Sequence, residues 1–357
     1  MSNSRKDPSA LPRWGVVATV DEPLPLIAAF VAHHHAVGAD EIHLFFDRPN
    51  PQAEALVAQV AGVHVHHSGE DGWARAWQAK RPPRIEARQK YNATRVLDES
   101  GLDWVVHCDA DEFVTLERPL EWELARVPPQ KGWLKLEVDE RAYVTRQPGL
   151  HIFEGVFRRR WPDFKHAGEL LYGARARFLN KGLTGHVAGK ACVRAGRGYA
   201  MGVHFCLKTW DETQNVVPYR PSYNARLQHY DGLTPLHYVL KMLRRASTVV
   251  AGDPIPYSGP RSAQFIAAEA IAGDARALSD LWWDVLGVSA EETAALEECA
   301  ALSRDPSAIA EEVAALFPQV DLSPRAFDLA LLGHEADLIR AARDRWGFDP
   351  APLVSKP

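Results

Sequence analysis

The stretch that decides the fold is Leu102-Asp-Trp-Val-Val-His-Cys-Asp-Ala-Asp-Glu-Phe113. Its first half is a short apolar run, which is typical of a strand buried on both faces of a sheet. Its second half places the carboxylates of Asp109 and Asp111 one residue apart, directly after that strand. Two such carboxylates can converge on one hard divalent cation, Mg²⁺ or Mn²⁺. The same pattern also occurs in turns and at helix N-caps, so its meaning depends on the surrounding sequence.

The chain before this stretch alternates apolar strand patterns with helical patterns. Strands are predicted over 14–20, 41–46, 63–67 and 102–108, and helices over 24–37, 53–60 and the second half of 73–99. This alternation indicates βαβ units and a mostly parallel sheet in an α/β fold. Ligands of such sheets bind at the carboxyl ends of the strands. Asp21, Asp47 and the Asp109–Asp111 pair all follow strand ends, so three strands deliver carboxylates to one edge.

Beyond residue 115 the pattern changes. Strands are predicted over 133–138, 151–157 and 199–207, with a spacing that suits antiparallel additions to the sheet. An amphipathic helix is predicted over 234–250, and the Ala-, Leu- and Glu-rich chain from 262 onward is helical in composition.

These patterns predict a sheet domain over 12–215, with halves 12–115 and 116–215, and a C-terminal helical region over 216–357. The last helices carry apolar stripes and no chemical motif. Isolated helices are marginal in water, so the stripes need a partner surface, either the sheet domain or a second copy in a homodimer.

The composition excludes several classes of protein. With 41 basic and 46 acidic side chains in 357 residues the formal net charge is −5, whereas proteins that coat nucleic acids are usually basic. The cysteines form no CxxC pair, which disfavours a zinc ribbon or a disulfide framework and is typical of reduced thiols. No run of 18 apolar residues predicts a transmembrane helix, and the polar start lacks the apolar core of a signal peptide. We therefore expect a cytoplasmic protein without a nucleic-acid partner.

Further motifs accompany the acidic stretch in a fixed order. They are Val17-Ala-Thr-Val-Asp-Glu22, Phe30-Val-Ala-His-His-His-Ala-Val-Gly38, Ile42-His-Leu-Phe-Phe-Asp47, Arg88-Gln89-x-x-Asn92, Trp104 to Phe113, Gly189-Lys-Ala-Cys-Val-Arg194, and His229-Tyr230 followed by Lys241. In this order and spacing, residues 14–245 resemble the nucleotide-sugar glycosyltransferases of GT-A fold, especially the family 2-like and family 92-like group.

The resemblance implies a Rossmann-like GT-A fold in which 12–115 is the donor half and 116–215 the acceptor half. It implies a hexosyltransferase that moves a sugar from a nucleoside-diphosphate sugar, with a UDP-sugar favoured, to a hydroxyl of a glycan or polysaccharide, with inversion. It also implies Mn²⁺ or Mg²⁺ as cofactor, which neutralises the charge that builds on the leaving diphosphate.

Site residues follow from the resemblance position by position. The implied metal ligands are Asp111, bound directly, Asp109, acting through water or at the ribose, and His204, with His229 as the second choice. The implied donor contacts come from strand ends and basic motifs: Thr19, Val20, Glu22, Asp47, Arg88, Asp109, Ala110, Lys190, Arg194 and His229. Each has a structural alternative, such as a turn at Asp47, a surface arginine at Arg88 or a packed histidine at His204.

An inverting enzyme also needs a general base near the acceptor hydroxyl. No motif separates the candidates Asp139, Glu140, Asp163 and Glu169. We choose Asp163 because it lies in an irregular segment flanked by aromatic residues, Trp161 and Phe164.

Other histidines and other functions fit less well. Consecutive helical residues point about 100° apart, so His33, His34 and His35 cannot all bind one ion. His64 and His66 share a strand face, where surface histidines are commoner than a zinc pair. The chain has no Gly-x-Ser-x-Gly elbow and no P-loop. A nucleotidyltransferase would carry a glycine-rich loop after the first strand, and a nucleotide-sugar binder without turnover is the remaining alternative.

Overall fold

The computed structural model describes residues 11–77, 79–147, 149–210, 217–250, 259–304 and 308–356. The chain divides into two compact units that are interleaved along the sequence. The first consists of Met1–Asp21, His33–Glu137 and Ala188–Leu227, and the second of Glu22–Ala32, Val138–Val187 and Gln228–Pro357. The predicted boundary at 215–216 lies outside the described residues, and the observed division falls at other places.

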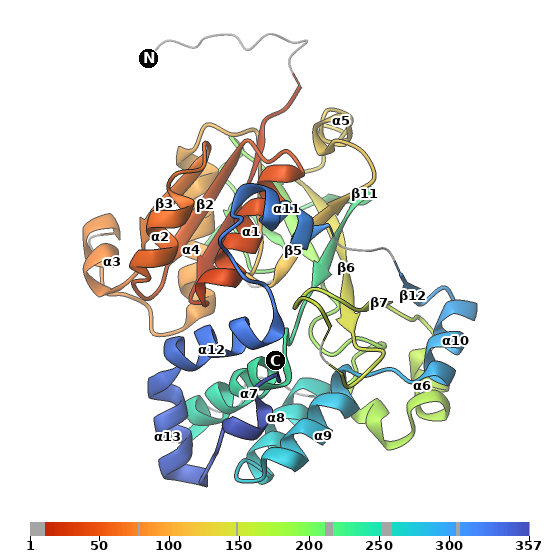
Figure 1. Ribbon diagram of the computed structural model, residues 1–357. Helices are drawn as coiled ribbons and strands as arrows, with labels where there is room; N and C mark the ends of the chain where they lie inside the picture. The colour runs from red at the N-terminus through yellow and green to blue at the C-terminus, as the bar shows by residue number, and fades with distance from the viewer. Residues whose placement is uncertain are drawn as a thin grey trace, which may run out of the picture. The chain divides into compact units, whose positions relative to one another are not determined.

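Four parallel strands form the centre of the first unit, in the order β3-β2-β1-β4. They are β1 (Trp14–Val20), β2 (Glu41–Phe46), β3 (Val63–His67) and β4 (Trp104–His107). Every residue of β1 and β4 is buried, as the continuous apolar runs predict for strands covered on both faces. Figure 1 shows β2 and β3 side by side, with α2 (Pro51–Val57) across them.

Antiparallel strands extend this sheet beyond β4. There β8 (Lys190–Arg194) pairs with β4, and the first half of β6 (Trp133–Ala142) pairs with β8. The remaining strands of the unit are β5 (Glu112–Leu116), β9 (Ala200–Met201), β10 (Cys206–Leu207) and β11 (Tyr219–His229), which ends in the second unit. The strand β5 pairs with β11, and β9 pairs with β10.

The helix α4 (Ile85–Glu99) covers one face of the parallel strands. Its Ala93, Val96 and Leu97 pack in a buried cluster with Val17 of β1 and Phe45 of β2. The shorter helices of this unit are α2, α3 (Glu70–Trp77) and α5 (Leu120–Leu124). The helix α1 (Leu24–Ala36) begins in the second unit and ends in the first.

The second unit combines a few strands with most of the helices. The second half of β6 pairs with β7 (Val156–Arg159), and β7 pairs with β12 (Leu302–Ser303), both antiparallel. Its helices are α6 (Phe164–Tyr172), η1 (Gly173–Phe178), α7 (Pro235–Val250), α8 (Pro260–Ala270), α9 (Ala275–Leu286), α10 (Ala290–Glu298), α11 (Ile309–Leu316), α12 (Pro324–His334), α13 (Ala336–Trp346) and η2 (Ala351–Leu353). Helices α7, α8 and α9 pack side by side (Figure 1).

The predicted fold class is confirmed: a Rossmann-like mixed sheet with flanking helices, followed along the chain by further helices. Some predicted elements differ in extent. The strand predicted over 151–157 forms only from Val156, because Gly155 turns the backbone with a φ of 145°. The strand predicted over 199–207 is a hairpin of two short strands, β9 and β10. Among the described residues, no helix has the length and apolar character needed to cross a bilayer.

Gly189 is a position in the first unit where backbone geometry strongly restricts the side chain. Its φ is 71°, and a Cβ there would collide with the carbonyl oxygen of Leu136 on the neighbouring β6. Gly196 has nearly the same φ, 70°, with open space where its Cβ would lie.

We expect Gly189→Ala to destabilise the protein more than Gly196→Ala. The left-handed conformation alone costs about 1–2 kcal/mol with a Cβ, and only Gly189→Ala adds a collision with a paired strand. Urea unfolding of both variants measures the two free energies. Equal losses of unfolding free energy in the two variants would show that β6 shifts to accommodate the added methyl group.

Candidate functional site

The helix α4 directs three polar side chains, those of Arg88, Gln89 and Asn92, to the carboxyl edge of the parallel strands. Asn92 Nδ2 donates to Thr19 Oγ1 at 2.9 Å and to Ser68 Oγ at 3.1 Å, so it joins the ends of β1 and β3. Arg88 lies one helical turn earlier and Gln89 beside it, so the three project to neighbouring places. They account for the motif Arg88-Gln89-x-x-Asn92, in which the resemblance implied a role for Arg88 alone.

Arg88 holds the end of β2 through a buried bidentate ion pair with Asp47. Its Nε donates to Asp47 Oδ1 at 2.8 Å and its Nη2 to Oδ2 at 2.6 Å. Its Nη1 donates to the carbonyl oxygens of Pro82 and Pro83, both at 2.9 Å. Arg81 Nη2 adds a third bond to Asp47 Oδ1 at 2.6 Å. Asp47 and Arg88 thus bind each other, and the roles implied for them at the donor base and diphosphate stay predictions.

The acidic motif forms a tight turn between β4 and β5, and a buried lysine closes it. The backbone N–H of Asp109 donates to Glu112 Oε2 at 2.8 Å. Lys190 Nζ, at the start of β8, lies 2.8 Å from Asp109 Oδ2 and 3.1 Å from Glu112 Oε2. The side chains of Lys190 and Glu112 are both 0% exposed. Gln89 Nε2 donates to the other oxygen of Asp109, Oδ1, at 2.6 Å.

These contacts set the charge state of the turn. Burial by itself would raise the pKa of Asp109, but the groups around the carboxylate, the Lys190 ammonium first among them, together hold that pKa below its ordinary value. Burial would lower the pKa of Lys190, but the carboxylates of Asp109 and Glu112 raise it. Burial lowers the pKa of His107, the last residue of β4, to about 4, so its imidazole is neutral near pH 7. The ammonium therefore stays charged between its two carboxylates.

The donor set of the turn fits a hard divalent cation. Asp109, Asp111 and Glu112 with Lys190 carry a formal net charge of −2, and carboxylate oxygens are the ligands that Mg²⁺ and Mn²⁺ prefer. Both oxygens of Asp109 already accept hydrogen bonds. This favours the implied division of roles, in which Asp111, 9% exposed, binds the ion directly and Asp109 acts through water.

His204 lies in the turn between β9 and β10. Its Nδ1 is 3.1 Å from the carbonyl oxygen of Gly189, the residue before Lys190. The preceding carbonyl, that of Val203, is 3.3 Å from Nδ1 of His107. The turn is thus attached to both strands that carry the acidic site. Donation from Nδ1 to a carbonyl fixes the tautomer and the orientation of the His204 ring.

The predicted ligands do not converge as a closed site in the described parts of the chain. In those parts, three residues bring their ligand atoms within 4.8 Å of one another: Glu41, His43 and His64. Asp109, Asp111 and His204 form no such group, and their metal role stays a prediction.

The structure places the other predicted residues of the first unit in different ways. Val20 is 0% exposed, and its carbonyl oxygen accepts from the N–H of Asp47 at 2.9 Å. Ala110, 5% exposed, lies within the acidic turn. Arg194 pairs with Trp104 at the start of β4, about 13 Å along β8 from Lys190. Its guanidinium lies 4.3 Å from the Trp104 ring centroid, so it belongs to the opposite end of the sheet from the acidic turn.

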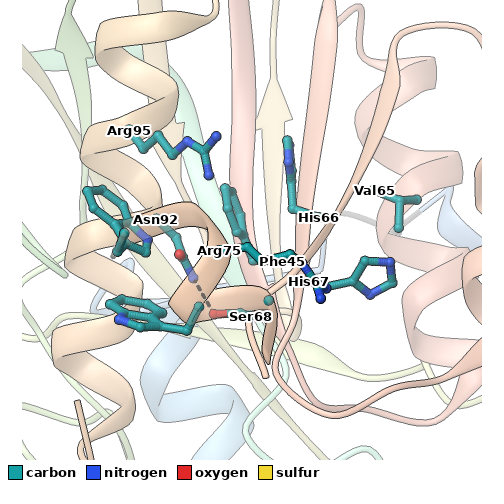
Figure 2. Close-up of a pocket in the computed structure, with 11 residues that line it drawn as sticks. Phe45, Val65, His66, His67, Ser68, Arg75, Asn92 and Arg95 are labelled. Carbon is teal, nitrogen blue, oxygen red and sulfur yellow. Dashed lines mark hydrogen bonds between the residues drawn. The ribbon is translucent and has the colours of Figure 1, made fainter. Parts of the chain in front are cut away.

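A cavity of about 270 Å³ opens beside the ends of β2 and β3 (Figure 2). Phe45 and His66 form a stacked pair with ring centroids 4.3 Å apart, and Trp73 stacks on Trp77 of α3 at 5.7 Å. The lining residues are Phe45, Val65, His66, His67, Ser68, Gly72, Trp73, Arg75, Trp77, Asn92 and Arg95. No motif in the sequence predicted this cavity, although the spacing of Trp73 and Trp77 places them on one helical face.

The remaining predicted residues belong to the second unit. His229 Nδ1 lies 3.2 Å from Glu140 Oε1, and Glu140 also accepts from the N–H groups of Thr184 and Gly185. The neighbouring Asp231 is 1% exposed and accepts from Lys241 and Arg261. This network uses His229 and the base candidate Glu140 as buried structural partners.

Asp163 and Glu22 lie at the ends of helices of the second unit. Asp163 is exposed at the start of α6, where its carbonyl oxygen accepts from the N–H of His166 at 2.9 Å. Glu22 precedes α1, and its Oε2 is 3.8 Å from Nε2 of His237. Of the other base candidates, Asp139 pairs with Arg159 at 3.3 Å.

Two of the histidines in the His33–His35 run have structural partners. His33 Nε2 lies 2.7 Å from the carbonyl oxygen of Val114 on β5, and His34 Nε2 accepts from the N–H of the same residue at 3.3 Å. They hold the end of α1 to the strand that follows the acidic turn.

Two solved structures are weakly similar to this chain. No protein-family model and no curated protein matches the chain. The solved structure of a mycobacterial protein is similar over 67% of this chain and 76% of its own, with 13% identity and a TM-score of 0.33. The apo structure of the bifunctional glycosyltransferase WbbM is similar over 55% of this chain and 34% of its own, with 14% identity and a TM-score of 0.28. At these TM-scores neither likeness bears on function.

We expect Lys190→Met to lower stability strongly at neutral pH, by about 3–5 kcal/mol, because the carboxylates of Asp109 and Glu112 lose their buried counter-ion. In Lys190→Met the carboxylates of Asp109 and Glu112 stay buried without the ammonium, so burial should raise their pKa values and they should take up protons as the pH falls from 7 to 4. The deficit of Lys190→Met should therefore shrink on acidification. Urea unfolding at pH 7 and pH 4 measures it.

Lys135→Met is the matched control for this prediction. Lys135 lies on the neighbouring β6 and pairs with Glu137 near the surface, where an ion pair contributes about 0–1 kcal/mol. If Lys190→Met lowers the free energy of unfolding by the same amount at both pH values, Lys190 does not act by compensating the charge of the two carboxylates.

Proposed function

We propose that the chain is a metal-dependent glycosyltransferase that uses a nucleoside-diphosphate sugar, with a UDP-sugar favoured, and transfers the sugar to a hydroxyl of a glycan. The observation that carries the proposal is the acidic turn at the carboxyl end of β4, closed by Lys190 and Gln89 with Asp111 beside them. The turn lies at the edge where parallel α/β sheets bind ligands. The resemblance of the motifs around it to the GT-A glycosyltransferases agrees with this use.

The residues of the turn would prepare the site for a charged leaving group. Asp111 would hold Mn²⁺ or Mg²⁺, with Asp109 in the outer shell and His204 completing the set. The ion would supply charge neutralisation at the departing diphosphate. Lys190 fixes the position of Asp109 by ion pairing and Gln89 fixes its second oxygen, so this carboxylate is positioned before a donor binds.

The cavity beside β2 and β3 is suited to the base of the nucleotide. Its volume, about 270 Å³, is close to the lower end of ligand pockets and has room for one flat ring. The half-buried Trp77 is the ring on which a base can stack, while Phe45 and Trp73, each 2% exposed, form the wall behind it. Asn92 lines the cavity and bonds to Thr19, one of the residues implied to contact the donor.

We expect Asp111→Asn to abolish Mn²⁺-dependent release of UDP from a UDP-sugar while the fold remains intact, because the site loses a formal charge and its direct ligand. Asp163→Asn, which alters the proposed general base, should keep donor hydrolysis and lose transfer to the acceptor. UDP release with and without Mn²⁺ and with and without acceptor measures both.

Asp98→Asn, an exposed substitution at the end of α4, is the matched control and should leave both reactions unchanged. A wild-type rate of UDP release in purified Asp111→Asn would rule out the metal assignment.

We expect Trp77→Ala to raise the Kd for UDP by about tenfold, since stacking of a base on an aromatic ring contributes about 1–3 kcal/mol. Trp122→Ala removes a half-exposed tryptophan from α5 of the same unit and serves as control. Calorimetric titration of UDP with Mn²⁺ present gives both constants. An unchanged Kd in Trp77→Ala would place the base outside this cavity.

A further inference from the structure

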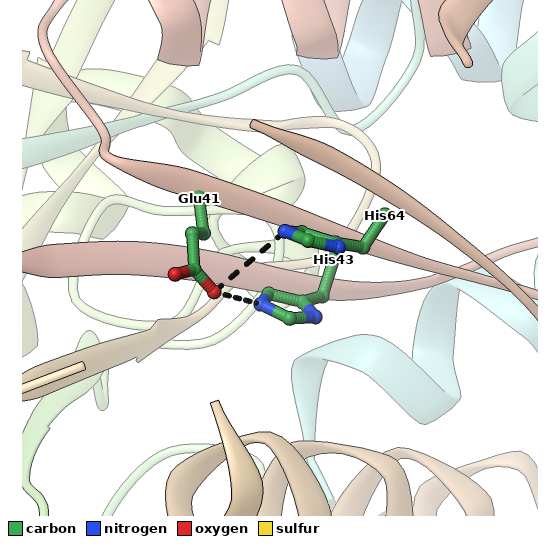
Figure 3. Close-up of side chains that lie close together, drawn as sticks. All are labelled: Glu41, His43 and His64. Atoms are coloured by element: carbon green, nitrogen blue, oxygen red, sulfur yellow. Dashed lines mark hydrogen bonds and ion pairs between the residues drawn. The ribbon is translucent and has the colours of Figure 1, made fainter. Parts of the chain in front are cut away.

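Three side chains at the start of β2 and β3 form a cluster separate from the acidic turn. The parallel register pairs His43 with His64, and Glu41 lies two residues before His43 on the same face of the sheet. Figure 3 shows both imidazoles directed at the Glu41 carboxylate. Since β2 runs from Glu41 to Phe46, Glu41 is about 17 Å and His43 about 10 Å from the strand end next to Asp47.

The distances in the cluster fit a tetrahedral ion. Glu41 Oε2 lies 3.0 Å from His43 Nε2 and 3.7 Å from His64 Nε2, and all three ligand atoms are within 4.8 Å of one another. A zinc ion with bonds of about 2.0–2.1 Å holds its ligand atoms about 3.3 Å apart. The two rings are stacked, with centroids 4.5 Å apart and planes 14° from parallel, so their Nε2 lone pairs run side by side. A rotation of the half-exposed His64 side chain, without a change of backbone, is what would direct both nitrogens at one ion.

The residues around the cluster support metal binding by its members. His43 Nδ1 lies 3.2 Å from His66 Nε2, so the ring can donate from Nδ1 while Nε2 binds a metal. Arg13 Nη2 donates to the other Glu41 oxygen, Oε1, at 2.8 Å and leaves Oε2 directed at the histidines.

The ligand types select the class of ion. Two imidazoles and one carboxylate suit Zn²⁺ and neighbouring transition metals, whereas Mg²⁺ prefers an all-oxygen shell. The His64 side chain is 46% exposed, which gives an ion a path from solvent and room for a water as fourth ligand.

We propose that Glu41, His43 and His64 form a Zn²⁺ site that joins β2 to β3 at the amino ends of the strands. The site is distinct from the proposed glycosyltransferase site and does not depend on it. An ion there would add a cross-link to the backbone ladder between the two strands, and so it would stabilise the folded first unit.

The proposal is tested by titration of the full chain, freed of metal by a chelator, with Zn²⁺ alone. The wild type should bind one Zn²⁺ at this site, and the Kd should rise at least tenfold in His64→Ala. His64 is half-exposed, so its removal should leave the fold intact. Addition of Zn²⁺ should raise the melting temperature of the wild type and leave that of His64→Ala nearly unchanged. Co²⁺ in place of Zn²⁺ should give the visible absorption of a four-coordinate site in the wild type.

Two control variants show whether Zn²⁺ binds at this cluster or at another place on the chain. His67→Ala removes an exposed histidine from the end of the same strand, and it should bind Zn²⁺ as the wild type does. Asp111→Asn should also keep the Zn²⁺ site, since the acidic turn lies at the other strand ends. Zn²⁺ affinity that is unchanged in His64→Ala, or lost equally in His67→Ala, would overturn the proposal.

Discussion

A single buried ammonium, that of Lys190, is the interaction on which the acidic turn depends. The turn brings Asp109, Asp111 and Glu112 together within four residues, and Glu112 is completely buried. Carboxylates at such proximity repel one another unless a cation compensates them. Because Lys190 comes from β8, far along the chain, the turn acquires its geometry only when the antiparallel strand has paired with β4. The charge balance of the acidic turn therefore depends on the pairing of β8 with β4.

The helix α4 extends this constraint to the neighbouring strands. Arg88, Gln89 and Asn92 each bind a different strand end, with Asp47, Asp109 and Thr19 as the acceptors. The helix α4 thus fixes the positions of the ends of β1, β2 and β4 relative to one another. The apolar side chains of α4 pack against apolar residues of the same sheet. Side chains held in this way lose little further entropy when a ligand binds.

The sequence alone predicts the parallel strands well. The apolar runs of β1 and β2 reflect burial on both faces, whereas β3 follows from the alternation of valine and histidine, and its residues are half-buried or exposed. The strands predicted over 14–20, 41–46 and 63–67 have the bounds of β1, β2 and β3. In contrast, β5 and β8 carry polar residues in buried positions, Glu112 and Lys190, and no periodicity predicts them. The strand β11 does alternate apolar and polar residues from Tyr219 to Gln228, a strand pattern that the prediction missed. The motif at Gly189-Lys190 marks a site residue, but its role as a counter-ion depends on a contact with a residue 81 positions earlier. Likewise, the resemblance implied that Lys190 and Arg194 both contact the donor. In the structure they lie at opposite ends of β8, and only Lys190 is at the end next to the acidic turn.

The interleaving of the two units along the sequence affects folding during translation. The first unit lacks its strands β8 and β11 until the ribosome has passed residue 227, although its parallel core is among the first segments translated. The short segment Glu22–Ala32 belongs to a unit whose helices are synthesised last. Domains that are contiguous in sequence can fold one after another during translation. Here the apolar segments that are synthesised first stay exposed until the strands and helices that cover them have been synthesised. Dependence on chaperones during synthesis is the expected cost of this order.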